Sequence, residues 1–400
     1  MTIRYDVGLF FLLVVSLKSR LSCIQTVPEP DTKMKPNFKL RRSNLKKTIK
    51  SQGLANSFLI TNIKNVCYLT GFTGSSANLL ITPKGDYLLS DSRYESQLKT
   101  EVSDLKVEIR DAKTTLLDLT RQILQTLKIK AISYESDSIA KSAFDQLESK
   151  LEGTELVATS GLVEQIRAIK DKFEIAAIRK SIEVNQRAFN VIRAQLTREQ
   201  TERTVAHNLE HQMRAFGAKG CAFDPIVGVG PRAALPHGRP SEKRIGESPI
   251  VLIDWGAEVN LYLSDITRVL VTGKITSRFA KIYNVVLKAQ VAAIKKIRPG
   301  AKLQSIDKTA RRIIESAGYG KYFGHSLGHS FGLEIHEKPS LAPTAEGVLE
   351  AGMVVTVEPG IYIPDFAGVR IEDDILVTPD GYEILSNLPK ELDSCAVDLD

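Results

Sequence analysis

The sequence predicts an α/β domain followed by an α+β domain, and three observations support this division. Short apolar runs typical of buried strands alternate with helical patterns through the first half. Strands of hairpin type dominate the second half, between a few longer helical segments. The chain has 400 residues, 43% of them apolar and 25% charged, which is ordinary composition and sufficient length for two cores. We expect an N-terminal extension or possible signal segment at 1–33, one domain at 34–162 and a second at 163–400.

The first domain opens with helical apolar spacing that runs from Asn37 to Gly53, where the glycine favours termination. Pro83-Lys84-Gly85 lies between two apolar runs and predicts a hairpin turn. The apolar runs that predict strands are 57–61, 78–82, 86–90, 106–109 and 131–135, and the helical patterns that separate them are 115–128 and 138–151. This order predicts a largely buried mixed sheet.

The second domain follows a boundary that we expect between Ser160 and Ile169. A long helical stretch continues from there to about Leu196. Further helices are expected at 201–216, 276–297 and 305–317, with strands dominating the intervening sequence.

The net charge of +7 is located almost entirely at the N-terminus. Residues 1–53 carry eleven Lys/Arg against three Asp/Glu, so the rest of the chain sums to −1. A nucleic-acid-binding groove would need basic residues in the folded body, and this distribution argues against one.

The N-terminal segment contains eleven apolar residues, Val7–Leu17, which suit a signal-peptide core but are too few to span a bilayer. Asp6 before this run, basic residues after it and the lack of a small-residue cleavage site argue against export. The true start could be Met1 or Met34. Four isolated cysteines, without CxxC spacing, suit a reducing compartment. We therefore expect a cytoplasmic protein, with export as the alternative.

Two aspartates lie inside apolar runs of the second domain. Asp254 and Asp265 occur in "VLIDWGAEVNLYLSDITRVLV", and a carboxylate in a buried strand is rarely tolerated unless it is paired or bound to metal. A hairpin folded about Val259–Asn260 would set the two opposite each other, with Cβ atoms roughly 5 Å apart. That separation suits a shared cation.

A second hairpin repeats this arrangement in "VVTVEPGIYIPDFAGVRIEDDILV". Glu358 and Glu372 are equidistant from Asp365, which lies in a turn-like stretch. Four carboxylates brought together would repel one another strongly unless cations neutralise them. We expect the adjacent Asp373 and Asp374 to be salt-bridged structural groups.

Three of the six histidines fall within "GHSLGHSFGLEIHE", at positions 325, 329 and 336. Four carboxylates and one imidazole are a suitable donor set for a dinuclear metal site. The glycines of this stretch disfavour a helix and predict a loop or strand that approaches the site closely. His207 and His211 lie in a helical pattern with polar neighbours, and we expect them on a helix surface.

At these residues the chain resembles the pita-bread metallopeptidase family, which includes aminopeptidase P, prolidase and methionine aminopeptidase. The similarity extends over nearly everything after Met34. The first half, including "NVCYLTGFTGSSANLLIT", resembles the creatinase-type N-terminal domain, and the second half resembles the pita-bread catalytic domain. "LPHGRPSEKRI" places His237 seventeen residues before Asp254, as in the proline-directed branch. Gly238 and Ser330 depart from the commoner Ala and Gly.

The resemblance implies that five residues bind two divalent metal ions per chain. Asp254 would hold one metal, Asp265 and Glu372 would bridge both, and His329 and Glu358 would complete the second. Ligation rich in oxygen with a single imidazole favours Mn²⁺, with Co²⁺ or Zn²⁺ as alternatives.

The resemblance also implies catalytic roles. Glu358 would transfer the proton to the leaving proline nitrogen. His336 and His237 would stabilise the oxyanion and hold the scissile-bond region. His325 would line the proline pocket, and Arg370 would support the aspartates.

The activity implied is hydrolysis of the N-terminal Xaa-Pro bond, as by aminopeptidase P, which the "GFTGSS" segment favours. The alternatives are an Xaa-Pro dipeptidase (prolidase) and, in another class, a catalytically inactive pita-bread binding module, which would typically have lost ligands. The expected partner is a peptide with proline at its second position. We expect a homodimer with no nucleic-acid partner and no stable membrane span.

Overall fold

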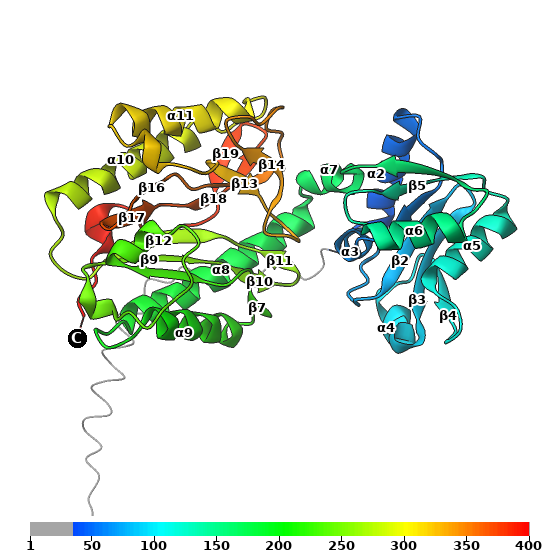
Figure 1. Cartoon of the computed structure of the whole chain (residues 1–400), viewed down its shortest axis with the longest axis horizontal. Helices are drawn as coiled ribbons and strands as arrows, with labels where there is room; N and C mark the ends of the chain where they lie inside the picture. The colour runs from blue at the N-terminus through cyan, green and yellow to red at the C-terminus, as the bar shows by residue number, and fades with distance from the viewer. Residues whose placement is uncertain (1–34, 400) are drawn as a thin grey trace, which may run out of the picture. The chain divides into compact units, whose positions relative to one another are not determined.

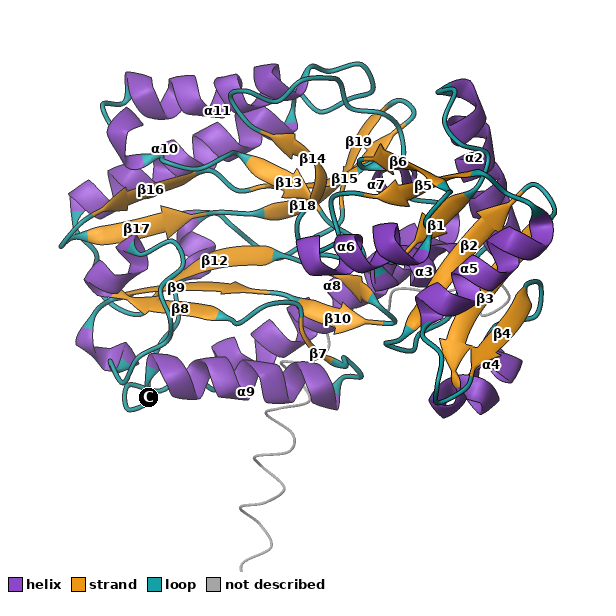
Figure 2. Ribbon diagram, turned by 45° about the vertical axis from the view of Figure 1, so that its right-hand side comes forward, coloured by secondary structure: helices purple, strands orange, loops and turns teal. Residues whose placement is uncertain are grey.

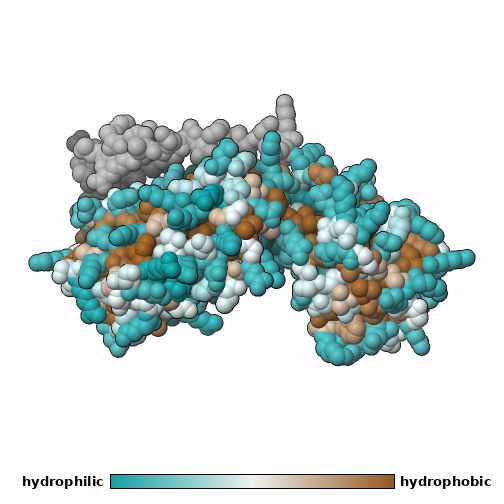
Figure 3. All heavy atoms as spheres, turned by 90° about the horizontal axis from the view of Figure 1, so that it is seen from above, coloured by the Kyte–Doolittle hydropathy of each residue, from teal (hydrophilic) through white to brown (hydrophobic). Residues whose placement is uncertain are grey.

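The computed structural model describes residues 35–399, so the expectations for 1–33 lie outside the described residues. Within that range, no helix is both long enough and apolar enough to cross a bilayer. Polar residues cover most of the face drawn in Figure 3, with apolar residues visible between them in small groups. Such a mixture is ordinary for a folded protein surface.

The first half contains the mixed sheet that the sequence predicts. Its strand order is β4-β3-β2-β1-β5-β6, with antiparallel pairing of β1, β2 and β3 and parallel pairing elsewhere. The strands are β1 (Phe58–Ile60), β2 (Ala77–Thr82), β3 (Gly85–Asp91), β4 (Lys106–Arg110), β5 (Ala131–Glu135) and β6 (Glu155–Thr159). Thr82 pairs with Gly85, which confirms the predicted turn at Pro83-Lys84.

Helices accompany this sheet (Figure 1). They are α2 (Phe38–Ser51), α3 (Ile63–Thr70), α4 (Glu95–Glu101), α5 (Leu116–Leu127), α6 (Lys141–Lys150) and α7 (Leu162–Ala168), with a 3-10 turn η1 (Ser92–Tyr94). The sequence prediction missed α3 and α4, which have only eight and seven residues. Local capping defines α3: the Asn62 side chain accepts a hydrogen bond from the backbone of Lys64, and Gly71 ends the helix at φ 81°.

The second half has four longer helices, all at predicted positions. They are α8 (Lys172–Ala194), α9 (Glu202–Ala215), α10 (Ser277–Ile294) and α11 (Leu303–Ser316). A capping box formed by Asp171 and Glu174 begins α8. The helices pack as two pairs, α8 with α9 and α10 with α11, and the strands lie between the pairs (Figure 1).

The strands of this half form small antiparallel sheets with the orders β11-β10-β7, β12-β9-β8, β14-β13-β15-β18-β19 and β16-β17 (Figure 2). They are β7 (Gly220–Cys221), β8 (Ile226–Val229), β9 (Ile250–Trp255), β10 (Ala257–Val259), β11 (Tyr262–Leu263), β12 (Ile266–Val271), β13 (Gly328–Ser330), β14 (Glu337–Leu341), β15 (Val354–Val357), β16 (Gly360–Ile363), β17 (Ala367–Arg370), β18 (Asp373–Thr378) and β19 (Gly381–Ile384). Short 3-10 turns connect them: η2 (Gly230–Ala234), η3 (Ile245–Glu247), η4 (Gly320–Tyr322) and η5 (Leu392–Cys395). The second half is therefore α+β, as predicted.

Candidate metal centre

The first acidic pair lies on the hairpin of β9 and β12, but in a register that differs from the prediction. Asp254 pairs with Thr267, two residues beyond Asp265. The predicted midpoint was wrong because the turn is made by Asn260 and Leu261, both at positive φ (50° and 75°). A shift of two residues keeps side chains on the same face of a strand, so the aspartates still face one region.

The second acidic pair lies on the predicted hairpin in the predicted register. Val357 pairs with Asp373 on one side, and Gly360 pairs with Arg370 on the other. Continuing this register places Glu358 opposite Glu372. Asp365 forms the turn at φ 58°, so the symmetry expected about this residue is confirmed.

The two hairpins bring their carboxylates together. One oxygen each from Asp254, Asp265 and Glu372 lie within 4.8 Å of one another, and all three residues are buried. His329, on β13, approaches the same group: its Nε2 lies 3.6 Å from an Asp265 oxygen and 3.4 Å from a Glu358 oxygen. The structure thus gathers all five residues of the predicted ligand set.

The electrostatics of this group favour a bound cation. Burial, together with the neighbouring carboxylates, raises the pKa of Asp265 and Glu372 well above their ordinary values. Burial also raises the pKa of Glu358 to about 8, although Arg370 opposes the shift. Asp254 and Glu372 each keep one buried oxygen without a hydrogen-bond partner. These unpartnered oxygens and the oxygen-rich donor set fit divalent cations.

Hydrogen bonding orients the imidazole of His329. Its Nδ1 donates to the backbone carbonyl of Ser330 at 3.1 Å, which leaves Nε2 unprotonated and directed at the carboxylates. Burial lowers the pKa of His329 to about 4, so the ring is neutral at pH 7. A neutral ring with its second nitrogen donating to a carbonyl is the usual state of a metal-binding histidine.

Arg370 and Thr267 hold the acidic group through hydrogen bonds and an ion pair. Arg370 pairs with Asp254 and donates through Nε to the Thr267 hydroxyl at 3.0 Å. The Thr267 hydroxyl in turn donates to Glu372 at 2.6 Å. This chain of contacts fixes carboxylates from both hairpins relative to each other.

The remaining predicted histidines surround the group. His325 donates through Nδ1 to the Ser326 carbonyl at 2.7 Å, and its Nε2 lies 3.0 Å from the Tyr362 hydroxyl. Burial lowers its pKa to about 4. The ring of His336 lies edge-on to His329 with centroids 4.4 Å apart. His237 is exposed and lines the same cavity.

A cavity of about 1200 Å³ contains every predicted site residue in its wall. His207, which we expected on a helix surface, is exposed on α9 and also borders this cavity, whereas His211 is exposed and does not line it. Tyr362, which accepts a hydrogen bond from Arg370 at 2.7 Å, was not among the predicted site residues. Its position on the second acidic hairpin, facing the strand that carries Arg370, was the available signal.

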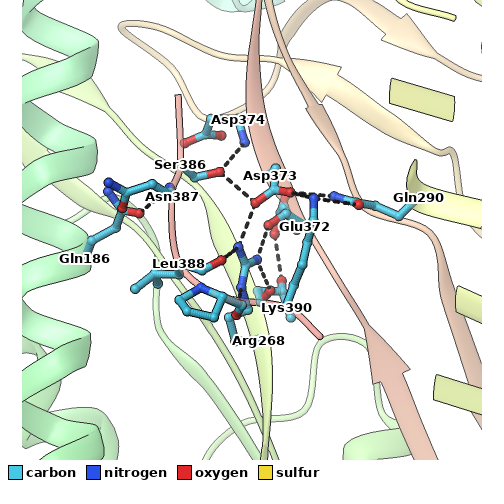
Figure 4. Close-up of polar contacts among 12 residues, drawn as sticks. Gln186, Arg268, Gln290, Glu372, Asp373, Asp374, Ser386, Asn387, Leu388 and Lys390 are labelled. Atoms are coloured by element: carbon cyan, nitrogen blue, oxygen red, sulfur yellow. Dashed lines mark hydrogen bonds and ion pairs between the residues drawn. The ribbon is translucent and has the colours of Figure 1, made fainter. Parts of the chain in front are cut away.

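Asp373 and Asp374, beside Glu372, have different environments. Asp373 pairs with Arg268 and Lys390, as predicted (Figure 4). Burial opposes its ionisation, but the two cations hold its pKa below the ordinary value. Asp374 has no Lys or Arg partner among residues 35–399, and burial raises its pKa. The prediction of a salt bridge was therefore wrong for Asp374.

Comparisons with known proteins agree with this site. The model of metallopeptidase family M24 matches residues 176–379, and that of the creatinase/prolidase N-terminal domain matches residues 41–169. An Xaa-Pro dipeptidase from Pyrococcus horikoshii is 38% identical over 335 residues, covering 84% of this chain and 93% of the relative.

Solved structures are similar over nearly their whole length. An Xaa-Pro dipeptidase from Bacillus anthracis has a TM-score of 0.85 at 38% identity, covering 89% of this chain and 99% of that one. An X-Pro aminopeptidase from Thermotoga maritima has a TM-score of 0.79 at 37% identity, covering 86% and 97%. The chain therefore belongs to metallopeptidase family M24, the pita-bread hydrolases, and carries their creatinase-type N-terminal domain.

Proposed function

We propose that this metallopeptidase is an Xaa-Pro dipeptidase, which hydrolyses the single peptide bond of a dipeptide whose second residue is proline. The observation that carries the hydrolytic part is the group of four carboxylates and His329 in the wall of one cavity. The relatives named Xaa-Pro dipeptidase and the structures named prolidase support the dipeptidase over the aminopeptidase P activity that we first expected. We revise that expectation accordingly.

The residues proposed to hold two divalent cations are Asp254, Asp265, His329, Glu358 and Glu372. When bound, the two cations supply Lewis acidity and a water of lowered pKa. The family implies divalent metal ions, and the oxygen-rich donor set favours Mn²⁺, with Co²⁺ or Zn²⁺ as alternatives.

Glu358 is the proposed proton carrier. Its side chain is 16% exposed and reaches the cavity, and burial raises its pKa to about 8. A carboxylate that lines the cavity beside the proposed cations can accept a proton from the attacking water and return it to the proline nitrogen as the bond breaks.

The three other histidines are proposed to bind substrate. His336 and His237 would donate hydrogen bonds to the carbonyl oxygen as negative charge develops on it. His325 is fixed by Ser326 and Tyr362, and Tyr362 is fixed by Arg370. We propose that this rigid wall contacts the proline ring and places the scissile bond over the acidic group.

The test is an assay of the metal-loaded enzyme on matched Xaa-Pro dipeptides, Xaa-Pro-Xaa tripeptides and Xaa-Ala dipeptides. We expect cleavage of the Xaa-Pro dipeptides, with kcat/KM for both other sets at least about tenfold lower. Tripeptide turnover equal to that of dipeptides would instead support assignment as an aminopeptidase P. Equal rates on Ala and Pro peptides would refute proline specificity, and no hydrolysis at all would favour an inactive binding module.

A further inference from the structure

Lys170 is a buried cation that none of the proposed catalytic roles employs. It lies between α7 and α8, and its side chain is only 1% exposed. Burying an ammonium group is costly, and an apolar side chain of similar length would fill the same volume without that cost. The contacts of this ammonium therefore need an explanation beyond packing.

The first contact leads to His329. Lys170 Nζ donates to the hydroxyl of Ser330 at 2.8 Å. Ser330 is fully buried, and its backbone carbonyl accepts the hydrogen bond from Nδ1 of His329. The lysine thus fixes the residue whose carbonyl sets both the tautomer and the direction of the His329 ring.

The second contact leads to His336. Lys170 Nζ also lies 3.3 Å from the carboxylate of Glu337, the residue that follows this histidine. The other oxygen of Glu337 accepts from Arg167 and from the backbone N–H groups of Leu333 and Glu334, at 3.0 and 3.2 Å. One carboxylate therefore ties together the loop that ends at His336.

We propose that Lys170 is a positioning residue that fixes His329 through Ser330 and His336 through Glu337. The two rings are already in edge-on contact, so a single ammonium controls the relative placement of a proposed metal ligand and a proposed oxyanion donor. The proposal builds on the proposed function for its kinetic readout, while its metal-binding readout is independent of any substrate.

The first test compares Lys170→Met with a matched control, Arg42→Met. Arg42 is 3% exposed and hydrogen-bonds a carbonyl and a carboxylate, but within the N-terminal domain. The metal-free proteins are titrated with Mn²⁺ by calorimetry, and Tm, kcat and KM are measured on an Xaa-Pro dipeptide.

We expect Lys170→Met to weaken Mn²⁺ binding by about tenfold or more, as loss of a group that orients a ligand typically does. We expect kcat to fall by a similar factor with KM within about twofold, because Lys170 does not line the cavity. Arg42→Met should lower Tm yet leave Mn²⁺ affinity and kcat unchanged. Equal losses in both variants, or wild-type Mn²⁺ affinity in Lys170→Met, would overturn the proposal.

Ser330→Ala decides the matter if Lys170→Met fails to fold. It removes only the hydroxyl that accepts from the lysine and keeps the carbonyl that orients His329. Weaker Mn²⁺ binding, in the same direction as for Lys170→Met, supports the proposal, and unchanged binding refutes it. If the wild-type protein binds Mn²⁺ but cleaves no Xaa-Pro peptide, the proposed substrate fails while the positioning role is still tested by the titration.

Discussion

Replacing Arg268 by methionine removes a buried guanidinium that supports the proposed metal centre. Arg268 is 2% exposed and pairs with Asp373 at 2.7 Å. It also donates to the backbone carbonyls of Thr267, Glu372, Leu388 and Pro389 (Figure 4). One side chain thereby joins the strand of the first acidic pair, the backbone of a proposed ligand and the C-terminal segment.

The expected loss of stability follows from the polar groups that lose their partner when Arg268 is replaced. Asp373 keeps Lys390, Gln290 and Ser386 as partners but loses its most buried cation, and four carbonyls lose a donor. Breaking a buried ion pair by removing one partner costs about 3–5 kcal/mol. At about 2 °C per kcal/mol for a large domain, Tm should fall by roughly 6–10 °C.

The assay is thermal and urea unfolding in excess chelator, because bound metal would otherwise add its own stabilisation. A second variant, Arg268→Met with Asp373→Asn, also removes the carboxylate charge that Arg268 neutralises. It should recover about half of the lost stability. Mn²⁺ affinity should stay low in both variants, since neither restores the hydrogen bond to the Glu372 carbonyl. A free energy of unfolding for Arg268→Met within about 1 kcal/mol of wild type would refute the predicted loss. Recovery of Mn²⁺ affinity in the double variant would refute the link to the Glu372 carbonyl.

Three further predictions test the site and its surroundings. Elemental analysis should find about two divalent ions per chain, and full activity in excess chelator would contradict the dinuclear proposal. Glu358→Ala and His329→Ala should each abolish turnover, while His211→Ala, on the exposed surface of α9, should stay near wild type. Comparable losses of turnover in all three variants would show that the roles of the histidines were wrongly assigned. Burial opposes ionisation of Glu337, but Lys170 and Arg167 hold its pKa below the ordinary value. The ionised carboxylate therefore stabilises the fold at pH above its ordinary pKa of about 4.3, and this stabilisation is lost as the pH falls below that value. Urea midpoints measured between neutral and acidic pH should therefore fall less steeply for Glu337→Gln, and parallel curves would refute the assignment.

The acidic hairpins show what a single sequence can predict about this site. Glu358 and Glu372 were placed opposite each other because strand pairing is symmetric about a turn, and Asp365 marks that turn. The first register was wrong by two residues, because the left-handed turn includes Leu261, a residue type that rarely adopts positive φ, as well as Asn260. The predicted grouping survived this error, since a shift of two residues does not change the face.

The contacts that support the site from other segments of the chain were not predictable from the sequence. Thr267 and Glu372 are 105 residues apart, and Lys170 and Ser330 are 160 apart. Nothing in the local pattern around Lys170 distinguishes it from a cation on a solvated helix. The apolar run around Arg268 indicates burial but not which groups the guanidinium contacts. Only the fold brings Arg268 to the backbone carbonyl of Glu372 and Lys170 to the hydroxyl of Ser330, the residue after His329.

The distribution of cations around the acidic residues indicates where metal belongs. Asp373 and Glu337 lie next to proposed site residues and are neutralised by Arg or Lys from the chain itself. Asp265, Glu358 and Glu372 have no Lys or Arg ion-pair partner among the residues that the structure describes, although all three line the cavity. Asp374 also lacks such a partner but lies outside the cavity wall, where burial can keep it protonated. Among these residues, access to the cavity and the lack of a cation from the chain coincide at Asp265, Glu358 and Glu372, which are three of the four carboxylates proposed to bind metal. The fourth, Asp254, lines the same cavity and pairs with Arg370.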